Sequence, residues 1–431
     1  MPECGVPALA RVHCFLHQCT LRFFHAVLKF LAISERPCQS SCLYSFSERL
    51  PWSFVSNSFT RQINEKRKTG ATILDLTISN PTVALPDYPH SAIADAYANI
   101  DDFAYSPLPC GLEEARLAIA GYYLSRNREV FPSQVLVTAS TSEAYSLLFK
   151  LFCNPENEIL APVPSYPLFE YLAALESVRT VPYRLSYDGS WFIDFLSLRE
   201  HISDRTRAII VVNPNNPTGS FLKTFEIQEL LGIAQQHNLP IISDEVFMDY
   251  AFGNPADPVT TLIGHDSVLS FSLNGLSKLA CMPQMKLGWI VINGPTEERE
   301  LARQRLELIL DTYLSVSTPV QRALPRLLSI GAEMRRQMEG RIAENFNALH
   351  RILRNSPAHP LHAEGGWSAI IQLPKTLSEE TWIARILTEQ DVLVQPGYFF
   401  DLIQEPCIVV SLITPPKDFV QGIARVRELV C

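Results

Sequence analysis

The sequence predicts an α/β protein: a large domain with a mostly parallel sheet flanked by helices, plus a smaller α+β domain. Between residues 135 and 292, short continuous apolar segments alternate with helical segments. This pattern is typical of parallel strands that are buried on both faces. A long helical stretch from about residue 295 to 353 comes next, and mixed strand and helix patterns fill the rest of the chain.

The individual elements follow from the same periodicities. Strands of the large domain are expected at residues 135–137, 159–161, 208–212, 240–242, 268–271 and 289–292, with an extended segment at 180–184. Helices are expected at residues 58–68, 112–124, 142–152, 166–175 and 224–237. The smaller domain should contain strands at 73–78, 368–372, 392–394 and 408–412, with helices at 379–389 and near the C-terminus.

These elements divide the chain into five parts. Residues 1–45 are expected to be an N-terminal extension outside the fold, although the apolar stretch 21–33 also fits an amphipathic targeting helix. Residues 46–95 should form the N-terminal part of the small domain, and 96–294 the large domain. Residues 295–330 should be a connecting helix, and 331–431 the C-terminal small domain.

Composition excludes several classes of protein. The chain of 431 residues is 47% hydrophobic with a net charge of −9 and has no basic stripe, so we expect no nucleic-acid partner. The stretch 21–33 is too short and too charged to span a membrane. None of the ten cysteines forms a C-x-x-C pair, so we expect no metal site. Scattered single cysteines fit a reducing, cytoplasmic location.

The strongest candidate for chemistry is Lys278, which follows the buried strand 268–271 after a polar turn. The ends of buried strands are where α/β sheets present ligand-binding groups. A lysine placed there can lose solvation, lower its pKa and act as an amine nucleophile. A solvated loop lysine is the alternative interpretation of this motif alone.

Polar groups also follow the neighbouring strands. Asp244 follows strand 240–242 after Ser243, at a position where a carboxylate is costly unless it is paired with a cation such as a protonated pyridine nitrogen. Ser140, Thr141 and Ser142 precede a helix and could bind an anion at its N-terminus. Helix capping, a salt bridge or core packing would explain each of these groups in isolation.

Two further residues complete the set. Asn216 lies in the rigid turn Asn213-Pro-Asn-Asn-Pro-Thr-Gly219 and can donate a hydrogen bond to a phenolate oxygen. Tyr166, in Pro164-Ser-Tyr166-Pro, can stack on a flat ring or pack in the core.

Together these residues resemble the class I/II aminotransferase family of pyridoxal 5'-phosphate (PLP) enzymes, fold type I, from about residue 74 to 411. The resemblance implies that Lys278 is the Schiff-base lysine, that Asp244 pairs with the pyridine nitrogen and that Tyr166 stacks on the ring. It implies that Asn216 binds the 3-oxygen of the ring. The implied phosphate ligands are Ser140, Thr141, Ser142, Ser277, Lys286 and, from a partner subunit, Tyr105.

The implied function is a PLP-dependent aminotransferase, EC 2.6.1.-, that moves an amino group between a small-molecule amino donor and a 2-oxo acid. The family also implies a homodimer with shared active sites. Another PLP reaction (β-elimination, decarboxylation or racemisation) and a non-catalytic PLP-binding protein remain the alternatives.

The sequence departs from the family pattern at three positions. Phe247 replaces the tyrosine that bonds the ring oxygen, and Lys286 replaces an arginine, which makes it a point charge rather than a bidentate fork. Val409 aligns with the arginine that binds the substrate carboxylate. The last departure leaves the preferred amino donor open.

Overall fold

The computed structural model describes residues 44–50, 58–253, 260–314, 316–403 and 406–431. Almost all of the expected extension, 1–45, lies outside the described residues. Residue contacts divide the chain into two compact units, Met1–Ile73 and Leu74–Cys431. Helix α2 (Ser58–Lys68) belongs to the first unit and has the expected bounds. The five-part division drawn from the sequence stays a prediction.

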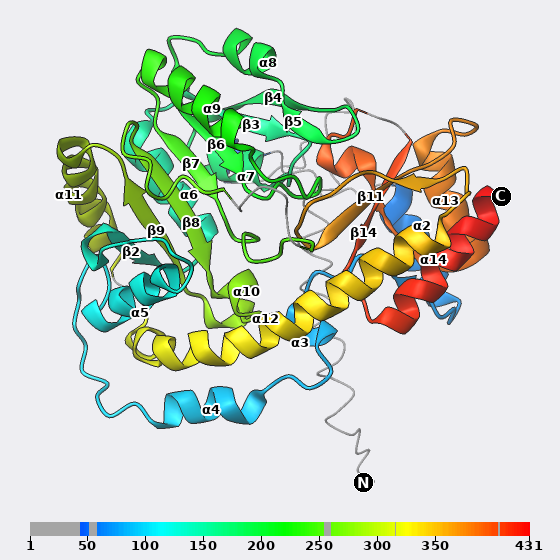
Figure 1. The fold of residues 1–431 in the computed structure, drawn as a ribbon, viewed down its shortest axis with the longest axis horizontal. Helices are drawn as coiled ribbons and strands as arrows, with labels where there is room; N and C mark the ends of the chain where they lie inside the picture. Colours follow the sequence, from blue (N-terminus) through cyan, green and yellow to red (C-terminus); the bar gives the residue numbers. More distant parts are fainter. Residues whose placement is uncertain (1–43, 51–57, 254–259, 315, 404–405) are drawn as a thin grey trace. The chain divides into compact units, whose positions relative to one another are not determined.

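The second unit contains an eight-stranded sheet in the order β2-β9-β8-β7-β6-β3-β4-β5 (Figure 1). Its strands are β2 (Val135–Thr138), β3 (Glu158–Val163), β4 (Arg179–Tyr187), β5 (Trp191–Ile193), β6 (Thr206–Val212), β7 (Ile241–Asp244), β8 (Ser270–Gly275) and β9 (Gly288–Asn293). The large, mostly parallel sheet is therefore confirmed. Among these eight strands, β5 and β9 pair antiparallel to their neighbours.

The strand directions place several carboxyl ends at one edge of this sheet. Strands β4, β3, β6, β7 and β8 run parallel in that spatial order. Strand β9 is antiparallel to both β8 and β2, so β2 runs in the same direction as β8. The loops after β2, β3, β6, β7 and β8 therefore meet at one edge, where ligands bind in open α/β sheets.

Helices flank the sheet. They are α5 (Glu113–Leu124), α6 (Thr141–Phe152), α7 (Leu168–Leu175), α8 (Phe195–Glu200), α9 (Thr224–His237) and α11 (Thr296–Tyr313), while the four-residue α10 (Leu276–Leu279) follows the carboxyl end of β8. Leu148 of α6 and Leu306 of α11 are fully buried in one cluster with Ile210, Phe271 and Ile290 from three strands. Burying such a side chain contributes about 1.5–3 kcal/mol, so this cluster fixes the strand order below the site.

The C-terminal part contains a second, four-stranded antiparallel sheet in the order β10-β11-β14-β13. Its strands are β10 (His359–Pro360), β11 (Ser368–Gln372), β13 (Gln395–Pro396) and β14 (Cys407–Ser411), packed with α13 (Glu379–Gln390) and α14 (Pro416–Val430). Strand β1 (Leu74–Asp75) pairs with β12 (Val392–Leu393), so the start of this unit joins its C-terminal part. The short α3 (Pro81–Ala84) and α4 (His90–Ala98) follow β1.

The prediction of one long helical stretch from about residue 295 to 353 was wrong in one respect, because the structure has two helices there. Helix α11 ends at Tyr313, and Leu314 has a left-handed backbone with φ of 68° that cannot continue a right-handed helix. Helix α12 (Thr318–Ile352) then begins and contacts α5 and α10 as well as α14 (Figure 1). No helix within the described ranges is both long and apolar enough to cross a membrane.

Candidate active site

Lys278 lies one turn beyond the carboxyl end of β8, in the four-residue helix α10. Its Nζ atom lies 4.7 Å from the ring centre of Trp367 and 5.5 Å from that of Phe247. Burial lowers the pKa of Lys278 to about 8, although Cys281 and Asp244 act in the opposite direction. Lys278 is therefore an amine that loses its proton more readily than an exposed lysine.

Asp244 ends β7 and lies opposite Leu273 of β8. The backbone N–H of Val246 donates to Oδ1 at 3.2 Å, and the Tyr145 hydroxyl donates to Oδ2 at 3.0 Å. Burial raises the pKa of Asp244 to about 6, while these two hydrogen bonds and the charge of Lys278 limit the rise. A cation near this carboxylate would hold it ionised.

The third group is the start of α6, which follows β2. Ser140 is the N-cap, and its Oγ accepts a hydrogen bond from the Glu143 N–H at 3.1 Å. Thr141 and Ser142 form the first turn. A Cβ at Gly288 would lie 3.1 Å from backbone atoms of Ser140 and Thr141, so β9 approaches this turn closely only because residue 288 is glycine. Such a helix N-terminus offers N–H groups to an anion.

Asn216 and Tyr166 occupy the loops after β6 and β3. The Ser368 hydroxyl donates to Asn216 Oδ1 at 3.1 Å, which leaves the amide nitrogen Nδ2 as the donor toward a ligand. Tyr166 is partly buried, and burial raises its pKa to about 12, so its ring stays neutral. Both loops leave the sheet at the same edge as Asp244 and Lys278.

The remaining predicted residues are less enclosed. Ser277 is partly buried beside Lys278. Lys286 is exposed, but it lines one pocket with Ala139, which places it beside the start of α6. Tyr105 is 66% exposed on the irregular segment 101–108, so within one chain it stays outside this cluster.

Sequence reasoning missed four residues that hold the predicted ones. Tyr145 donates to Asp244, Ser368 to Asn216, and Tyr250 to the backbone carbonyl of Lys278 at 2.7 Å. Trp367 packs edge-on against Tyr250 with ring centres 5.2 Å apart. The sequence signal that could have identified Trp367 is the pair of glycines before it, in Gly365-Gly-Trp367, because glycine is common where two backbones approach closely.

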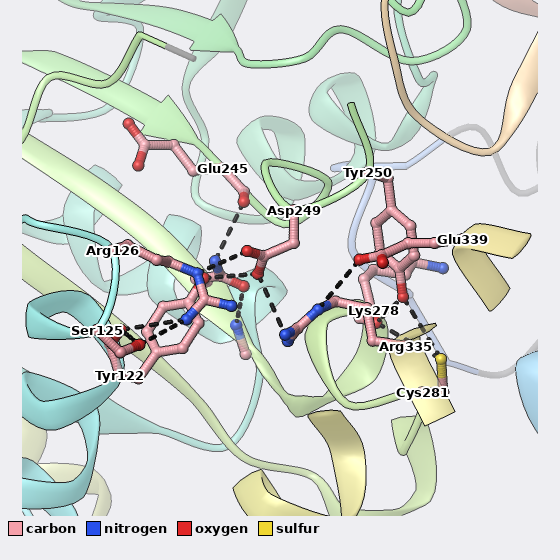
Figure 2. A network of polar contacts seen from close by, with 12 residues as sticks. Tyr122, Ser125, Arg126, Glu245, Asp249, Tyr250, Lys278, Cys281, Arg335 and Glu339 are labelled. Carbon is pink, nitrogen blue, oxygen red and sulfur yellow. Dashed lines mark hydrogen bonds and ion pairs between the residues drawn. The ribbon is translucent and has the colours of Figure 1, made fainter. Parts of the chain in front are cut away.

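A network of hydrogen bonds and ion pairs holds the loop between Asp244 and Tyr250 in place (Figure 2). Asp249 accepts from the Tyr122 hydroxyl at 2.7 Å and from Arg126 Nε at 2.6 Å, and Arg335 of α12 lies 3.8 Å away. The same loop ends in Tyr250, which holds the turn of Lys278. Helices α5, α10 and α12 are thus tied to one loop of the site.

The fold matches solved structures of one class of enzyme. Alanine aminotransferase from Pyrococcus furiosus aligns with a TM-score of 0.78 at 24% identity, covering 86% of this chain and 95% of that one. An aminotransferase from Escherichia coli aligns with a TM-score of 0.77, covering 90% and 98%. These likenesses confirm the expected fold, fold type I.

Sequence comparison gives the family. The family model "Aminotransferase class I and II" matches residues 71–420, and the chain belongs to this family. The glutamate-pyruvate aminotransferase AlaA of Escherichia coli (strain K12) is 28% identical over 300 residues, 69% of this chain and 74% of that protein. Tyrosine aminotransferase of Homo sapiens is 27% identical over 380 residues, 84% and 82%. The protein is therefore a PLP-dependent aminotransferase, EC 2.6.1.-.

The residues at the sheet edge fit PLP chemically. A helix N-terminus suits the phosphate, an amide nitrogen suits the ring oxygen, and the partly buried carboxylate of Asp244 suits a protonated pyridine nitrogen. The partly buried amine of Lys278, with its lowered pKa, suits the aldehyde.

Proposed function

We propose that Lys278 is the amine that binds PLP covalently and that Asp244 pairs with its pyridine nitrogen. The observation that carries this proposal is that both groups lie at the ends of neighbouring parallel strands, β8 and β7, and affect each other's charge. Asn216 Nδ2 binds the ring oxygen and Tyr166 stacks on the ring. Ser140, Thr141, Ser142, Ser277 and Lys286 hold the phosphate.

PLP, when bound, withdraws electrons from the substrate carbon that carries the amino group. The chain supplies the proton movement. With its amine free, Nζ of Lys278 would be the base for the proton on that carbon, and its lowered pKa would keep it partly neutral near physiological pH. The rings of Trp367 and Phe247 lie next to the amine and shield part of it from solvent.

We infer that the substrates are an amino acid and a 2-oxo acid, as the names of the glutamate-pyruvate and tyrosine aminotransferases suggest. Val409 is fully buried in β14 opposite Ile370 and Gln395, and it offers no cation to a carboxylate. Asn80 and Asn216 each use the side-chain oxygen as an acceptor, from Thr82 and Ser368 respectively. The amide nitrogens of both residues are therefore the candidate replacement donors to the carboxylate.

A homodimer with shared sites is part of the same proposal. Phe103, Tyr105 and Leu108 are 60%, 66% and 43% exposed on one irregular segment, and a second copy would cover them. A cytoplasmic location is supported by the five cysteines of the described ranges, none of which forms a disulfide. The domain boundaries 46–95, 96–294, 295–330 and 331–431 are proposed as drawn from the sequence.

Borohydride reduction of the PLP-loaded protein, followed by peptide mass mapping, tests the assignment of the lysines. The adduct should lie on Lys278, and an adduct on Lys286 would reverse the two roles. Lys278→Ala should remove the visible absorbance band and turnover, whereas exposed Lys375→Ala serves as the matched control and should leave both unchanged.

The reaction type is tested with a panel of L-amino acids and simple amines, with and without a 2-oxo acid acceptor. Transamination requires the acceptor for steady turnover. Turnover that does not depend on the acceptor would instead identify β-elimination, decarboxylation or racemisation.

A further inference from the structure

Tyr145 is a buried phenol beside the candidate active site that the family resemblance leaves without a role. It is the fifth residue of α6 and 2% exposed. Its hydroxyl lies 3.0 Å from Asp244 Oδ2 and donates to it. Its ring packs edge-on against Phe169, with centres 5.2 Å apart at 71°, and lies 6.0 Å from the ring of Phe149. The aromatic neighbours hold the phenol in the direction of Asp244.

We propose that Tyr145 is a positioning residue that fixes the Asp244 carboxylate, through its hydrogen bond to Oδ2, for a protonated pyridine nitrogen. The Val246 N–H binds the other oxygen, Oδ1, at 3.2 Å. With a donor on each oxygen the carboxylate plane cannot rotate, so its remaining lone pairs keep one direction. This inference rests on the proposed role of Asp244.

The hydrogen bond also favours the charged form of Asp244. Desolvation raises the pKa of this carboxyl group, and the groups that oppose it are the Val246 N–H, Tyr145 from α6 and Lys278 from α10. The remaining titratable neighbour of the phenol is Tyr183 of β4. Loss of the phenol removes one of these three opposing groups, so Asp244 would retain a proton at a higher pH and would lose the charge that attracts a pyridinium.

The position of Tyr145 on α6 adds a geometric consequence. The N-terminus of this helix is the proposed phosphate site, at Ser140 and Thr141. Tyr145 is one turn further along, about 6 Å by the helical rise, and contacts the group proposed for the nitrogen end of the ring. One rigid helix therefore sets the distance between the two ends of the cofactor site.

The test measures PLP affinity by titrating apoprotein and following the absorbance of the bound cofactor. Tyr145→Phe should weaken binding about tenfold at neutral pH, the size expected for one hydrogen bond to a charged group. Its loss of affinity on acidification should begin at a higher pH than in the wild type. The matched control is Tyr183→Phe, which deletes a buried phenol that donates to the Ile210 carbonyl at 2.8 Å, and it should bind PLP as the wild type does.

A double-mutant cycle with Asp244→Asn separates positioning from general packing. If Tyr145 acts through the carboxylate, Tyr145→Phe weakens PLP binding in the wild type but adds nothing in the background of Asp244→Asn. Equal weakening in both backgrounds, or in the Tyr183→Phe control, would overturn the inference. PLP affinity of Asp244→Asn equal to that of the wild type would overturn the proposed role of Asp244 itself.

Discussion

At the scale of single residues, burial decides when Lys278 can react. The neutral amine is the form that attacks an aldehyde, and an exposed lysine reaches half-neutrality only at about pH 10.4. Burial lowers the pKa of Lys278 to about 8. We predict that the rate of covalent PLP capture by the apoprotein rises with pH and has its midpoint near 8.

Stopped-flow absorbance across about pH 6.5 to 10.5 measures this rate, a range that spans both the lowered and the ordinary lysine pKa. A midpoint close to that of a free lysine would show that water reaches the amine, and that the rings of Trp367 and Phe247 do not enclose it. Phe247→Tyr keeps the ring and should leave the midpoint of the apoprotein near that of the wild type.

Glu245 is a second buried carboxyl group, with no direct part in the proposed chemistry. It is fully buried, and it accepts hydrogen bonds from Ser243, Thr261 and Ser272 and from the Leu262 N–H. Burial nevertheless raises its pKa to about 7. Between about pH 4.5 and 7 the folded protein therefore holds a proton that the unfolded chain has released.

The sign of the effect follows from this difference. As pH rises through that window, the free energy of unfolding of the wild type should fall relative to Glu245→Gln, by about 3.5 kcal/mol at most, since one pKa unit corresponds to about 1.4 kcal/mol. Urea denaturation of the two apoproteins at about pH 5 and about pH 8, on either side of the window, measures the change. Exposed Glu297→Gln controls for loss of a carboxylate, and a constant difference between Glu245→Gln and wild type would refute the assignment.

The sequence alone predicted those site residues that directly follow a recognisable strand pattern. Lys278, Asp244 and Asn216 each follow a continuous apolar run, so the strand pattern itself located them. Tyr145 is an ordinary buried helix residue by periodicity, and its role appears only when α6 packs beside the end of β7. Trp367 likewise reaches Lys278 through a contact between segments that lie far apart in the sequence.

At the scale of elements, the apolar runs predicted the strands of the large sheet because strands buried on both faces are continuously apolar. The apolar pattern does not indicate the direction of a strand, so the antiparallel pairing of β5 and β9 became known only from the structure. The break between α11 and α12 had a usable signal, since Ser317-Thr-Pro319 is a capping residue followed by a proline in the first turn. Pro325, in contrast, lies inside α12 without ending it.

Two glycines of α12 give a matched test of how this helix supports Lys278. A Cβ at Gly331 would lie 2.3 Å from Cβ of Ala280, the residue that ends the helix of Lys278, whereas a Cβ at exposed Gly340 would meet nothing within 4 Å. Gly331→Ala should reduce the free energy of unfolding by about 1–3 kcal/mol and weaken PLP binding. Gly340→Ala should raise stability by up to about 1 kcal/mol.

Thermal and urea unfolding of the two variants measure these changes, with PLP titration beside them. Gly331→Ala as stable as Gly340→Ala would mean that α12 and α10 separate without cost, and that α12 does not position the turn of Lys278.

At the scale of the whole molecule, the proposed homodimer would complete the phosphate site of each chain with a residue from its partner. Tyr105, the expected phosphate ligand of a partner subunit, is 66% exposed and lies between exposed Phe103 and Leu108. Three apolar or aromatic side chains exposed on one short segment are typical of a protein–protein contact surface. A second copy that receives this segment would bury them and place the Tyr105 hydroxyl at its own phosphate site.

This arrangement predicts that oligomeric state and cofactor affinity change together. If the proposed dimer forms through this segment, Phe103→Arg should make the protein monomeric in analytical ultracentrifugation, because it would place a charge in an apolar interface. The same substitution should weaken PLP binding, because each chain would lose the Tyr105 hydroxyl of its partner. Phe225→Arg on α9 is the matched control, since Phe225 is 61% exposed but lies outside the segment, and it should remain dimeric.

Tyr105→Phe should stay dimeric and lose only cofactor affinity, by about tenfold for one hydrogen bond to the phosphate. If Phe103→Arg became monomeric while its PLP affinity stayed at the wild-type value, the phosphate site would be complete within one chain, and Tyr105 would have no part in it.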